Sequence, residues 1–329
     1  MVDDTRGGVS IGDIEDARLR ISLLAVRTPL KPSQTLSSRL GKQVYLKLET
    51  MQPTGAFKLR GAANAILSLS SAQRKLGVVT CSAGNHGRAV AYVTRHVGIE
   101  ATIFLSSLVP ANKVQAISEL GATVIVTGAD FDEASAEARE FCADQGMTFV
   151  HAFDDREIVA GQGTIGLEIL DDLPNVDTII VPLSGGGLIA GIALAAKARK
   201  PSVHIIGVSM EHGAAMHESL KAGRPVSVKE EPTLADALAG GIELDNSVTF
   251  PLVRDLVDEV RLLSEAEIAD AMVFALLEER IVLEGAGATP LALLLRDDGA
   301  VRGDNIVAVC TGDNVDMTKL LALVQERAG

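Results

Sequence analysis

Short β-branched runs alternate with longer segments of helical period along most of the chain, and this alternation limits the fold more than any other sequence feature. Strands that alternate with helices usually pair in parallel, and the helices then cover both faces of the sheet. The runs that predict strands are residues 44–48, 77–81, 102–105, 123–127, 178–182, 203–208 and 305–310. The segments that predict helices include residues 111–120, 132–144, 157–171 and 265–279. A capping box of Ser264 and Glu267 opens the last of these helices. The sequence therefore predicts an α/β protein with parallel sheets covered by helices.

The length and charge of the chain narrow the classes of function. A chain of 329 residues is typical of about two domains, and no flexible linker or low-complexity tract divides this one. Its net charge of −13 repels phosphate backbones, so we expect no nucleic-acid partner. The longest apolar stretch, residues 188–196, is about half of a membrane span, so we expect no membrane partner. The net charge and the lack of a long apolar stretch therefore favour small molecules as ligands.

The cysteines and the first residues indicate a reducing compartment. Cys81, Cys142 and Cys310 are far apart and odd in number, which is typical of reduced core thiols rather than of a disulfide framework. Acidic residues follow Met1, where a secretion signal would carry positive charge. We therefore expect a cytoplasmic protein. A catalytic thiol would need a nearby histidine, and packing within a strand is the simpler reading of Cys81 and Cys310.

A glycine-containing turn follows the strand predicted at residues 77–81. Residues 82–87 (SAGNHG) join that strand to an apolar helix that starts at about Arg88. Unpaired backbone N–H groups and the helix dipole favour an anion at such a helix start, and a carboxylate fits there. The alternative is purely structural, with Ser82 and Asn85 serving as helix caps.

A second turn, residues 184–188 (SGGGL), again joins a strand to an apolar helix. Three successive glycines let their N–H groups wrap around a phosphate, although a packing turn without a ligand is the alternative. The same turn also satisfies the dinucleotide fingerprint, with Ala190 in the last position and Glu211 after the next strand. That pattern would indicate a nicotinamide-dependent oxidoreductase, but it leaves the first turn and Lys58 unexplained.

Three further segments complete a possible ligand site. Residues 310–314 (CTGDN) follow the last predicted strand, where open α/β sheets bind ligands. Residues 284–288 (EGAGA) precede another helix, and both segments offer polar groups to a heteroaromatic ring, although each alone is an ordinary cap or turn. Lys58 stands in residues 52–61 (QPTGAFKLRG). We take Lys58 as the candidate catalytic residue, because the same chain contains two turns that suit a phosphorylated aldehyde cofactor, with which an amine can react.

Taken in chain order, these segments resemble the fold-type II pyridoxal-phosphate enzymes, in the serine/threonine dehydratase family, over nearly the whole chain. The resemblance implies the two-domain α/β fold of tryptophan synthase β and bound pyridoxal 5'-phosphate. It implies that Lys58 forms the cofactor Schiff base and removes the substrate α-proton once burial lowers its pKa. The cofactor-binding residues that it implies are Phe57, Lys58, Asn85, Ser184, Gly185, Gly186, Gly187, Leu188, Glu284 and Thr311. The substrate-binding residues that it implies are Ser82, Ala83, Asn85 and His86.

The implied activity is elimination of the β-hydroxyl of threonine, serine or a related β-hydroxy amino acid, which gives a 2-keto acid and ammonia. Ala83 stands where the family's serine racemases place a second base, so we do not expect racemisation. Ser209 and Ala215 replace the acidic pair that binds a divalent ion in racemase-like members. We therefore expect no metal, and we read residues 212–218 as a solvated helical face rather than as ligands.

Three departures from the family pattern bear on the substrate. Ser184 replaces a first glycine, Ala56 replaces a frequent serine, and Ala237 stands where glycine is common. The hydroxyectoine-utilisation dehydratases are a branch in which such variants fit, so a hydroxyectoine-derived substrate is an alternative.

The resemblance also implies how the chain divides. We expect residues 1–70 and 150–329 to form a large cofactor-binding domain, with a small mobile domain, residues 71–149, inserted in it. Closure of the small domain on the substrate carboxylate would exclude water. The apolar composition and the family favour a homodimer or a larger homo-oligomer. A nicotinamide-dependent oxidoreductase and a non-enzymatic binding module remain as the other classes.

Overall fold

The computed structural model describes residues 7–109, 111–296, 299 and 301–327, and within them the strands form two sheets. The larger sheet has the strand order β1 (Leu30–Pro32), β2 (Gln43–Leu48), β10 (Asn305–Cys310), β7 (Thr178–Pro182), β8 (His204–Met210) and β9 (Glu259–Leu263). The smaller sheet has the order β5 (Thr123–Val126), β4 (Ala101–Leu105), β3 (Val78–Cys81) and β6 (Thr148–Phe149). Both sheets are parallel except for β1, which pairs antiparallel with β2.

The α-helices that accompany the sheets are α1 (Ile11–Arg20), α2 (Gln34–Leu40), α3 (Lys58–Leu67), α4 (Ser71–Leu76), α5 (Asn85–Val97), α6 (Ala111–Glu119), α7 (Phe131–Gln145), α8 (Arg156–Asp172), α9 (Gly187–Arg199), α10 (Ala215–Ala222), α11 (Thr249–Leu256), α12 (Glu265–Leu277), α13 (Gly285–Arg296) and α14 (Met317–Arg327). The 3-10 helices η1 (Glu49–Met51) and η2 (Asp236–Leu238) are shorter. Local capping explains several helix starts. Ser264 and Glu267 form the predicted capping box of α12, and Asp155 accepts from two N–H groups of α8.

The predicted α/β architecture is confirmed, and each predicted strand is present within a few residues of its expected bounds. The strands that the sequence predicts pair with one another in parallel, and the antiparallel edge strand β1 is not among them. Strands β1, β6 and β9 are not apparent from the sequence. Two of these strands are very short, and the side chains of β9 are mostly only half-buried, so none of them carries the apolar run that marks an interior strand.

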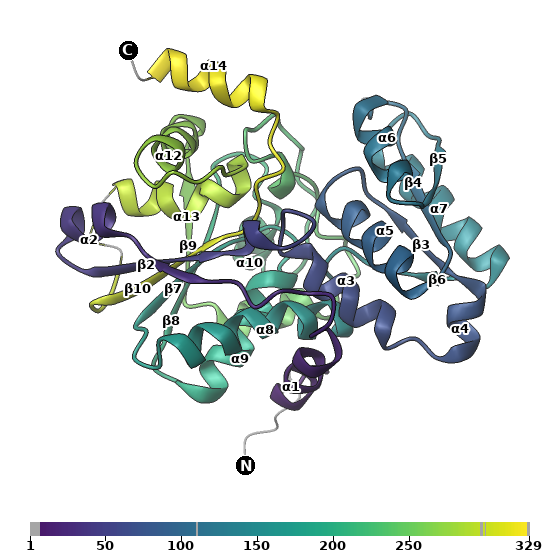
Figure 1. The fold of residues 1–329 in the computed structure, drawn as a ribbon, viewed down its shortest axis with the longest axis horizontal. Coiled ribbons are helices and arrows are strands. Elements are labelled where there is room, and N and C mark those ends of the chain that lie inside the picture. The colour runs from purple at the N-terminus through teal and green to yellow at the C-terminus, as the bar shows by residue number, and fades with distance from the viewer. Residues whose placement is uncertain (1–6, 110, 297–298, 300, 328–329) are drawn as a thin grey trace.

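Helices cover both faces of the larger sheet, as Figure 1 shows. Alternate side chains of β7 divide between the two faces, because successive residues of a strand point to opposite sides. Ile179 and Val181 pack with residues of α8 and α9, whereas Ile180 packs with residues of α12 and α13. The strands are therefore buried on both faces, which accounts for their continuous apolar sequences.

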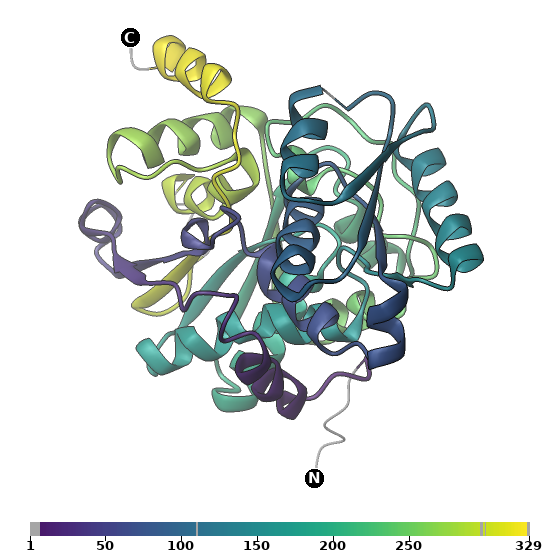
Figure 2. The ribbon, with the colours of Figure 1, turned by 45° about the vertical axis from the view of Figure 1, so that its right-hand side comes forward.

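The smaller sheet lies beside the larger one in both views (Figures 1 and 2), with α7 on one of its faces and α5 on the other. Helix α3 packs against α8, which lies on the larger sheet, and against α5, which lies on the smaller one. The candidate catalytic residue Lys58 therefore stands at the start of a helix that packs between α5 and α8. In the described part of the chain, no helix combines the length and the apolar character that a membrane crossing would need.

Candidate active site

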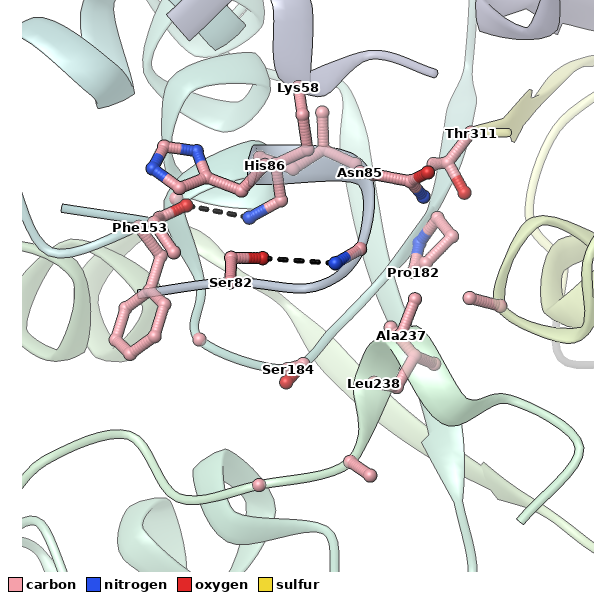
Figure 3. A pocket seen from close by; sticks show the side chains of 18 of the residues that line it. Lys58, Ser82, Asn85, His86, Phe153, Pro182, Ser184, Ala237, Leu238 and Thr311 are labelled. Carbon is pink, nitrogen blue, oxygen red and sulfur yellow. Dashed lines mark hydrogen bonds between the residues drawn. The ribbon is translucent and has the colours of Figure 1, made fainter. Parts of the chain in front are cut away.

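A cavity of about 360 Å³ lies between the carboxyl ends of strands from both sheets. Its wall includes Cys81 at the end of β3, Pro182 at the end of β7 and Thr311 just after β10. A cavity of this size is within the usual range for small-molecule sites. The structure brings together on its wall all of the predicted site residues, namely Phe57, Lys58, Ser82, Ala83, Asn85, His86, Ser184, Gly185, Gly186, Gly187, Leu188, Glu284 and Thr311. Figure 3 shows Lys58, Asn85 and Thr311 in its upper part and Ser184, Ala237 and Leu238 below them.

Lys58 presents its amine to this cavity from the first turn of α3. Its Nζ donates a hydrogen bond of 2.6 Å to the carbonyl oxygen of Ala152. Burial lowers the pKa of the Lys58 amine to about 8, although the negative charge of Glu284 acts in the opposite direction. A larger fraction of Lys58 amines than of ordinary lysines is therefore unprotonated near neutral pH and able to act as nucleophile or base.

A chain of polar side chains crosses the cavity wall near Lys58. The amide Nδ2 of Asn85 donates to Glu284 Oε1 at 2.8 Å, and the Asn85 Oδ1 accepts from Asn314 Nδ2 at 2.7 Å. Asn314 Nδ2 also donates to the Thr54 carbonyl oxygen at 2.9 Å. Burial raises the pKa of the Glu284 carboxyl to about 7, even though the hydrogen bond from Asn85 lowers it. This wall can therefore hold or release a proton close to neutral pH.

The first predicted turn starts α5 without a side-chain cap. The N-cap residue is Gly84, and the Ser82 Oγ accepts from the Gly84 N–H at 3.3 Å. The purely structural alternative, in which Ser82 and Asn85 cap the helix, is therefore wrong, since Asn85 instead bonds Glu284. Gly87 has no room for a side chain, because a Cβ there would lie 2.0 Å from the Ser82 carbonyl oxygen. The first N–H groups of α5 have no acceptor within the helix and remain suited to an anion.

The ring of His86 cannot donate a hydrogen bond to a carboxylate. Its Nε2 lies 3.0 Å from the Val150 carbonyl oxygen, which can only accept, so the ring proton is assigned to Nε2. Burial lowers the pKa of His86 to about 3, so the ring is neutral and Nδ1 carries no proton. The only His86 group that can donate a hydrogen bond to a substrate carboxylate is therefore its backbone N–H at the start of α5.

The second predicted turn leads into α9 through Gly186, whose φ of 88° is in the left-handed region that glycine tolerates. A Cβ at Gly185 would lie 2.3 Å from the Phe153 ring, and one at Gly187 would lie 2.9 Å from the Phe153 carbonyl oxygen. Packing against protein atoms therefore already requires these glycines. What the turn offers to a ligand is its N–H groups at the start of α9, where a phosphate is favoured.

Two backbone contacts tie the end of β10 to the segment before Lys58. The Phe57 N–H donates to the Thr311 carbonyl oxygen at 3.0 Å, and Ala56 forms an isolated bridge with Gly312. Thr311 is 2% exposed and lines the cavity together with Phe57. Of the three departures from the family pattern, Ser184 and Ala237 line the cavity, whereas Ala56 is buried behind it.

The cysteines are unsuited to nucleophilic chemistry. Cys81, Cys142 and Cys310 are free and buried. Burial raises the pKa of the Cys81 thiol to about 11, and it raises the pKa of Cys310 further. Because the thiolate is the reactive form, Cys81 remains inert although it lines the cavity.

Several cavity residues carry no signal in the sequence. The Ala152 carbonyl that binds Lys58 is a backbone atom, so no residue type marks it. Gln162 lines the cavity, and its buried Oε1 has no hydrogen-bond partner within the described residues, which leaves it open to a ligand donor. Residues 236–241 form another part of the wall. The sequence marks only Asp236 and Ala237 among them.

Neither a nicotinamide site nor a metal site is formed around this cavity by the residues that the structure describes. Glu211 follows β8, is exposed and does not line the cavity. The contact with a nicotinamide-cofactor ribose that the dinucleotide fingerprint would require is therefore not formed at this cavity. Across residues 7–109, 111–296, 299 and 301–327, no group of three His, Cys, Asp or Glu side chains is placed to hold a metal ion.

Comparison with known proteins gives consistent matches over most of the chain. A family model described as "Pyridoxal-phosphate dependent enzyme" matches residues 21–312. The "L-threonine dehydratase catabolic TdcB" of Staphylococcus aureus strain N315 is 45% identical over 321 residues, covering 96% of this chain and 92% of that protein. Threonine deaminase isoform 2 of Solanum lycopersicum is 34% identical with a TM-score of 0.91, covering 97% of this chain and 87% of that one. Maize serine racemase is 34% identical with a TM-score of 0.90, covering 97% and 98%.

Proposed function

The chain belongs to the pyridoxal-phosphate dependent enzyme family, and we propose that it is an ammonia-lyase that removes the β-hydroxyl of L-threonine or L-serine. The products are a 2-keto acid and ammonia. The observation that carries the proposal is Lys58, whose amine has a pKa of about 8 and stands in one cavity with the glycine turn of α9.

The cavity fits pyridoxal 5'-phosphate. The N–H groups of residues 184–188 at the start of α9 suit its phosphate, Thr311 and Asn85 suit polar atoms of its ring, and Phe57 offers an apolar surface beside Lys58. When bound, this cofactor supplies an electron sink for the substrate α-carbon. Thr311 would offer a hydroxyl to the ring, which, unlike a carboxylate, would not hold a proton on a ring nitrogen.

Lys58 moves the proton at the substrate α-carbon. Its Nζ donates to the Ala152 carbonyl oxygen at 2.6 Å, and this contact would orient the amine whenever it is free to take the proton. The pKa of about 8 leaves a useful fraction of Lys58 unprotonated at neutral pH. Loss of the β-hydroxyl as water and later hydrolysis complete the overall change to keto acid and ammonia.

The start of α5 binds the substrate carboxylate. The N–H groups of Asn85 and His86 and the hydroxyl of Ser82 are the donors there, since the ring proton of His86 is directed to the Val150 carbonyl. Ala83 lines the same wall and carries no acid or base. We therefore propose elimination rather than racemisation, although maize serine racemase shares the fold.

The same proposal extends to the substrate that the enzyme accepts, to its division into domains and to its oligomeric state. Ser184 and Ala237 change the cavity wall, which keeps a hydroxyectoine-derived β-hydroxy amino acid as the alternative substrate. We propose that residues 71–149 form a small domain, inserted between residues 1–70 and 150–329, that closes on the substrate. A cytoplasmic location and a homodimer or larger homo-oligomer belong to the same proposal.

Release of keto acid and ammonia from purified protein tests the proposal. The panel comprises L-threonine, L-serine, hydroxyaspartate and hydroxyectoine-derived amino acids, with Lys58→Ala as the inactive control. Turnover of L-threonine or L-serine that Lys58→Ala abolishes supports the lyase. Bound ligand without turnover would instead indicate a binding module. Tight nicotinamide binding that Glu211→Ala abolishes would instead support an oxidoreductase.

A further inference from the structure

His151 holds the backbone turn that contacts Lys58. Its Nδ1 accepts from the N–H groups of Phe153 at 3.1 Å and Asp154 at 2.8 Å, so Nδ1 carries no proton. Its Nε2 lies 3.1 Å from an oxygen of Glu243, so the ring proton is on Nε2 and is donated to that carboxylate. Glu243 thereby fixes both the tautomer and the orientation of the His151 ring.

The turn that His151 fixes touches the main parts of the proposed site. The Ala152 carbonyl oxygen accepts from Lys58 Nζ at 2.6 Å. The Phe153 ring meets the His151 ring edge-on at 4.6 Å and packs against Gly185 of the glycine turn. The Asp154 carboxylate accepts from three successive N–H groups at the start of α11, the nearest at 2.7 Å. A change in the turn would therefore reach Lys58 and the glycine turn together.

Glu243 has a backbone conformation that is unfavourable for a residue with a Cβ atom. Its φ is 63°, in the left-handed region, which costs a residue with a Cβ on the order of 1–2 kcal/mol. A glycine would adopt this conformation without that cost. Strain of this kind persists where neighbouring contacts hold it, and it is common at functional sites.

The carboxylate of Glu243 provides such contacts between three separate segments. Besides His151, it accepts from Arg139 at 2.8 Å, and Arg139 stands on α7 of the smaller sheet. The Arg139 guanidinium also lies over the Phe149 ring, 4.6 Å from its centre. The segment that carries Glu243 continues from residues 236–241 of the cavity wall. The cluster of Arg139, His151 and Glu243 thus ties the smaller sheet to the wall of the cavity.

We propose that Glu243 and Arg139 are positioning residues for the lyase reaction, acting through His151 on the turn that orients Lys58. The carboxylate of this left-handed glutamate, which glycine would lack, holds the turn through His151. The inference rests on the proposed function only for its effect on turnover. The effect on the turn itself is independent of any activity.

Glu243→Gly separates positioning from folding, because it removes the carboxylate while relieving the backbone strain. Glu243→Gln keeps an oxygen acceptor for His151, and Arg280→Gly is the matched control. Arg280 is the other described non-glycine residue with a left-handed φ, 58°, and it is exposed and does not line the cavity. Each variant is studied as holoenzyme by amide hydrogen exchange of residues 150–155 and by steady-state kinetics.

In Glu243→Gly, exchange of the Phe153 and Asp154 amides is expected to accelerate about tenfold, the equivalent of one hydrogen bond to a charged group. We expect kcat to fall by about the same factor with KM changed less, while cofactor absorbance is retained. Glu243→Gln is expected to stay within about threefold of the wild type, and Arg280→Gly to match it.

Wild-type exchange at Phe153 and Asp154 in Glu243→Gly would overturn the proposal, as would an equal change in Arg280→Gly. Accelerated exchange with unchanged kcat would overturn the link to Lys58. A wild-type holoenzyme without lyase activity would refute the proposed function, while the exchange data would still decide the role of Glu243 in holding the turn.

Discussion

Substitution of Glu284 by glutamine is expected to stabilise the cofactor-free protein at alkaline pH. Glu284 is 5% exposed, and burial raises the pKa of its carboxyl from 4.5 to about 7. The nearby Asp236 and Asp313 act in the same direction, whereas the hydrogen bond from Asn85 opposes them. The folded protein therefore holds this proton more tightly than the unfolded chain does. The stabilisation from that proton is fully present below pH 4.5 and is lost as the pH rises through 7.

The size of the effect follows from the two pKa values. A rise from 4.5 to about 7 corresponds to about 3 kcal/mol, of which roughly 2.5 kcal/mol is lost between about pH 5 and pH 8. Glutamine does not ionise and keeps the polar contact with Asn85. The difference in unfolding free energy between Glu284→Gln and the wild type should therefore grow by about 2–3 kcal/mol over that interval.

Urea denaturation of the cofactor-free proteins at several pH values from about 5 to 8 measures this difference. Glu49→Gln provides the contrasting control. Burial raises the pKa of Glu49, but the charge and hydrogen bonds of Arg60 outweigh it and lower the pKa overall. The Glu49 carboxylate is thus stabilising once ionised, and its loss should destabilise the protein at every pH tested. A Glu284→Gln difference that is the same at pH 5 and pH 8 would refute the reasoning.

Three other substitutions or titrations test the site. In the cofactor-free protein, the rate of acylation of the Lys58 amine should rise with pH with a midpoint near pH 8, because burial lowers the pKa of this amine. Peptide mass spectrometry measures the acylation, and a midpoint near pH 10.5 would contradict the prediction. Gly186→Ala should weaken pyridoxal-phosphate binding about tenfold in a fluorescence titration, because φ is 88° and a Cβ would lie 2.9 Å from Met216. An unchanged Kd would contradict that. Ala83→Ser adds a hydroxyl to the cavity wall, so D-serine should appear from L-serine on chiral chromatography only in the variant. Equal D-serine from the wild type would show that Ala83 does not prevent racemisation.

The positions of the two turns could be predicted from the sequence because parallel strands fix them. Residues 82–87 and 184–188 each follow an apolar strand, and the carboxyl ends of parallel strands meet ligands at one edge of a sheet. Lys58 could be identified only because these two turns occur in the same chain. Nothing in residues 52–61 themselves indicates that the Lys58 side chain is buried. Its lowered pKa arises from the packing of α3 between α5 and α8, which is a tertiary property.

The remaining parts of the site depend on contacts between distant segments. Asn85 bonds Asn314 across 229 positions of sequence, and the partner of Lys58 is a carbonyl at Ala152. The unprotonated state of the His86 Nδ1 depends on the Val150 carbonyl, which takes the ring proton of Nε2, and on burial, neither of which the SAGNHG turn reveals. The edge strand β1 was missed for a local reason, since three residues ending in Pro32 carry no strand periodicity.

The identity of the amine that binds the cofactor tests the account most directly. Borohydride treatment of the purified holoenzyme, followed by peptide mass spectrometry, locates the lysine to which the cofactor becomes fixed. We expect loss of the visible absorbance band and a pyridoxyl-phosphate mass on Lys58 alone. A label on another lysine, or a holoenzyme whose absorbance borohydride leaves unchanged, would contradict the account.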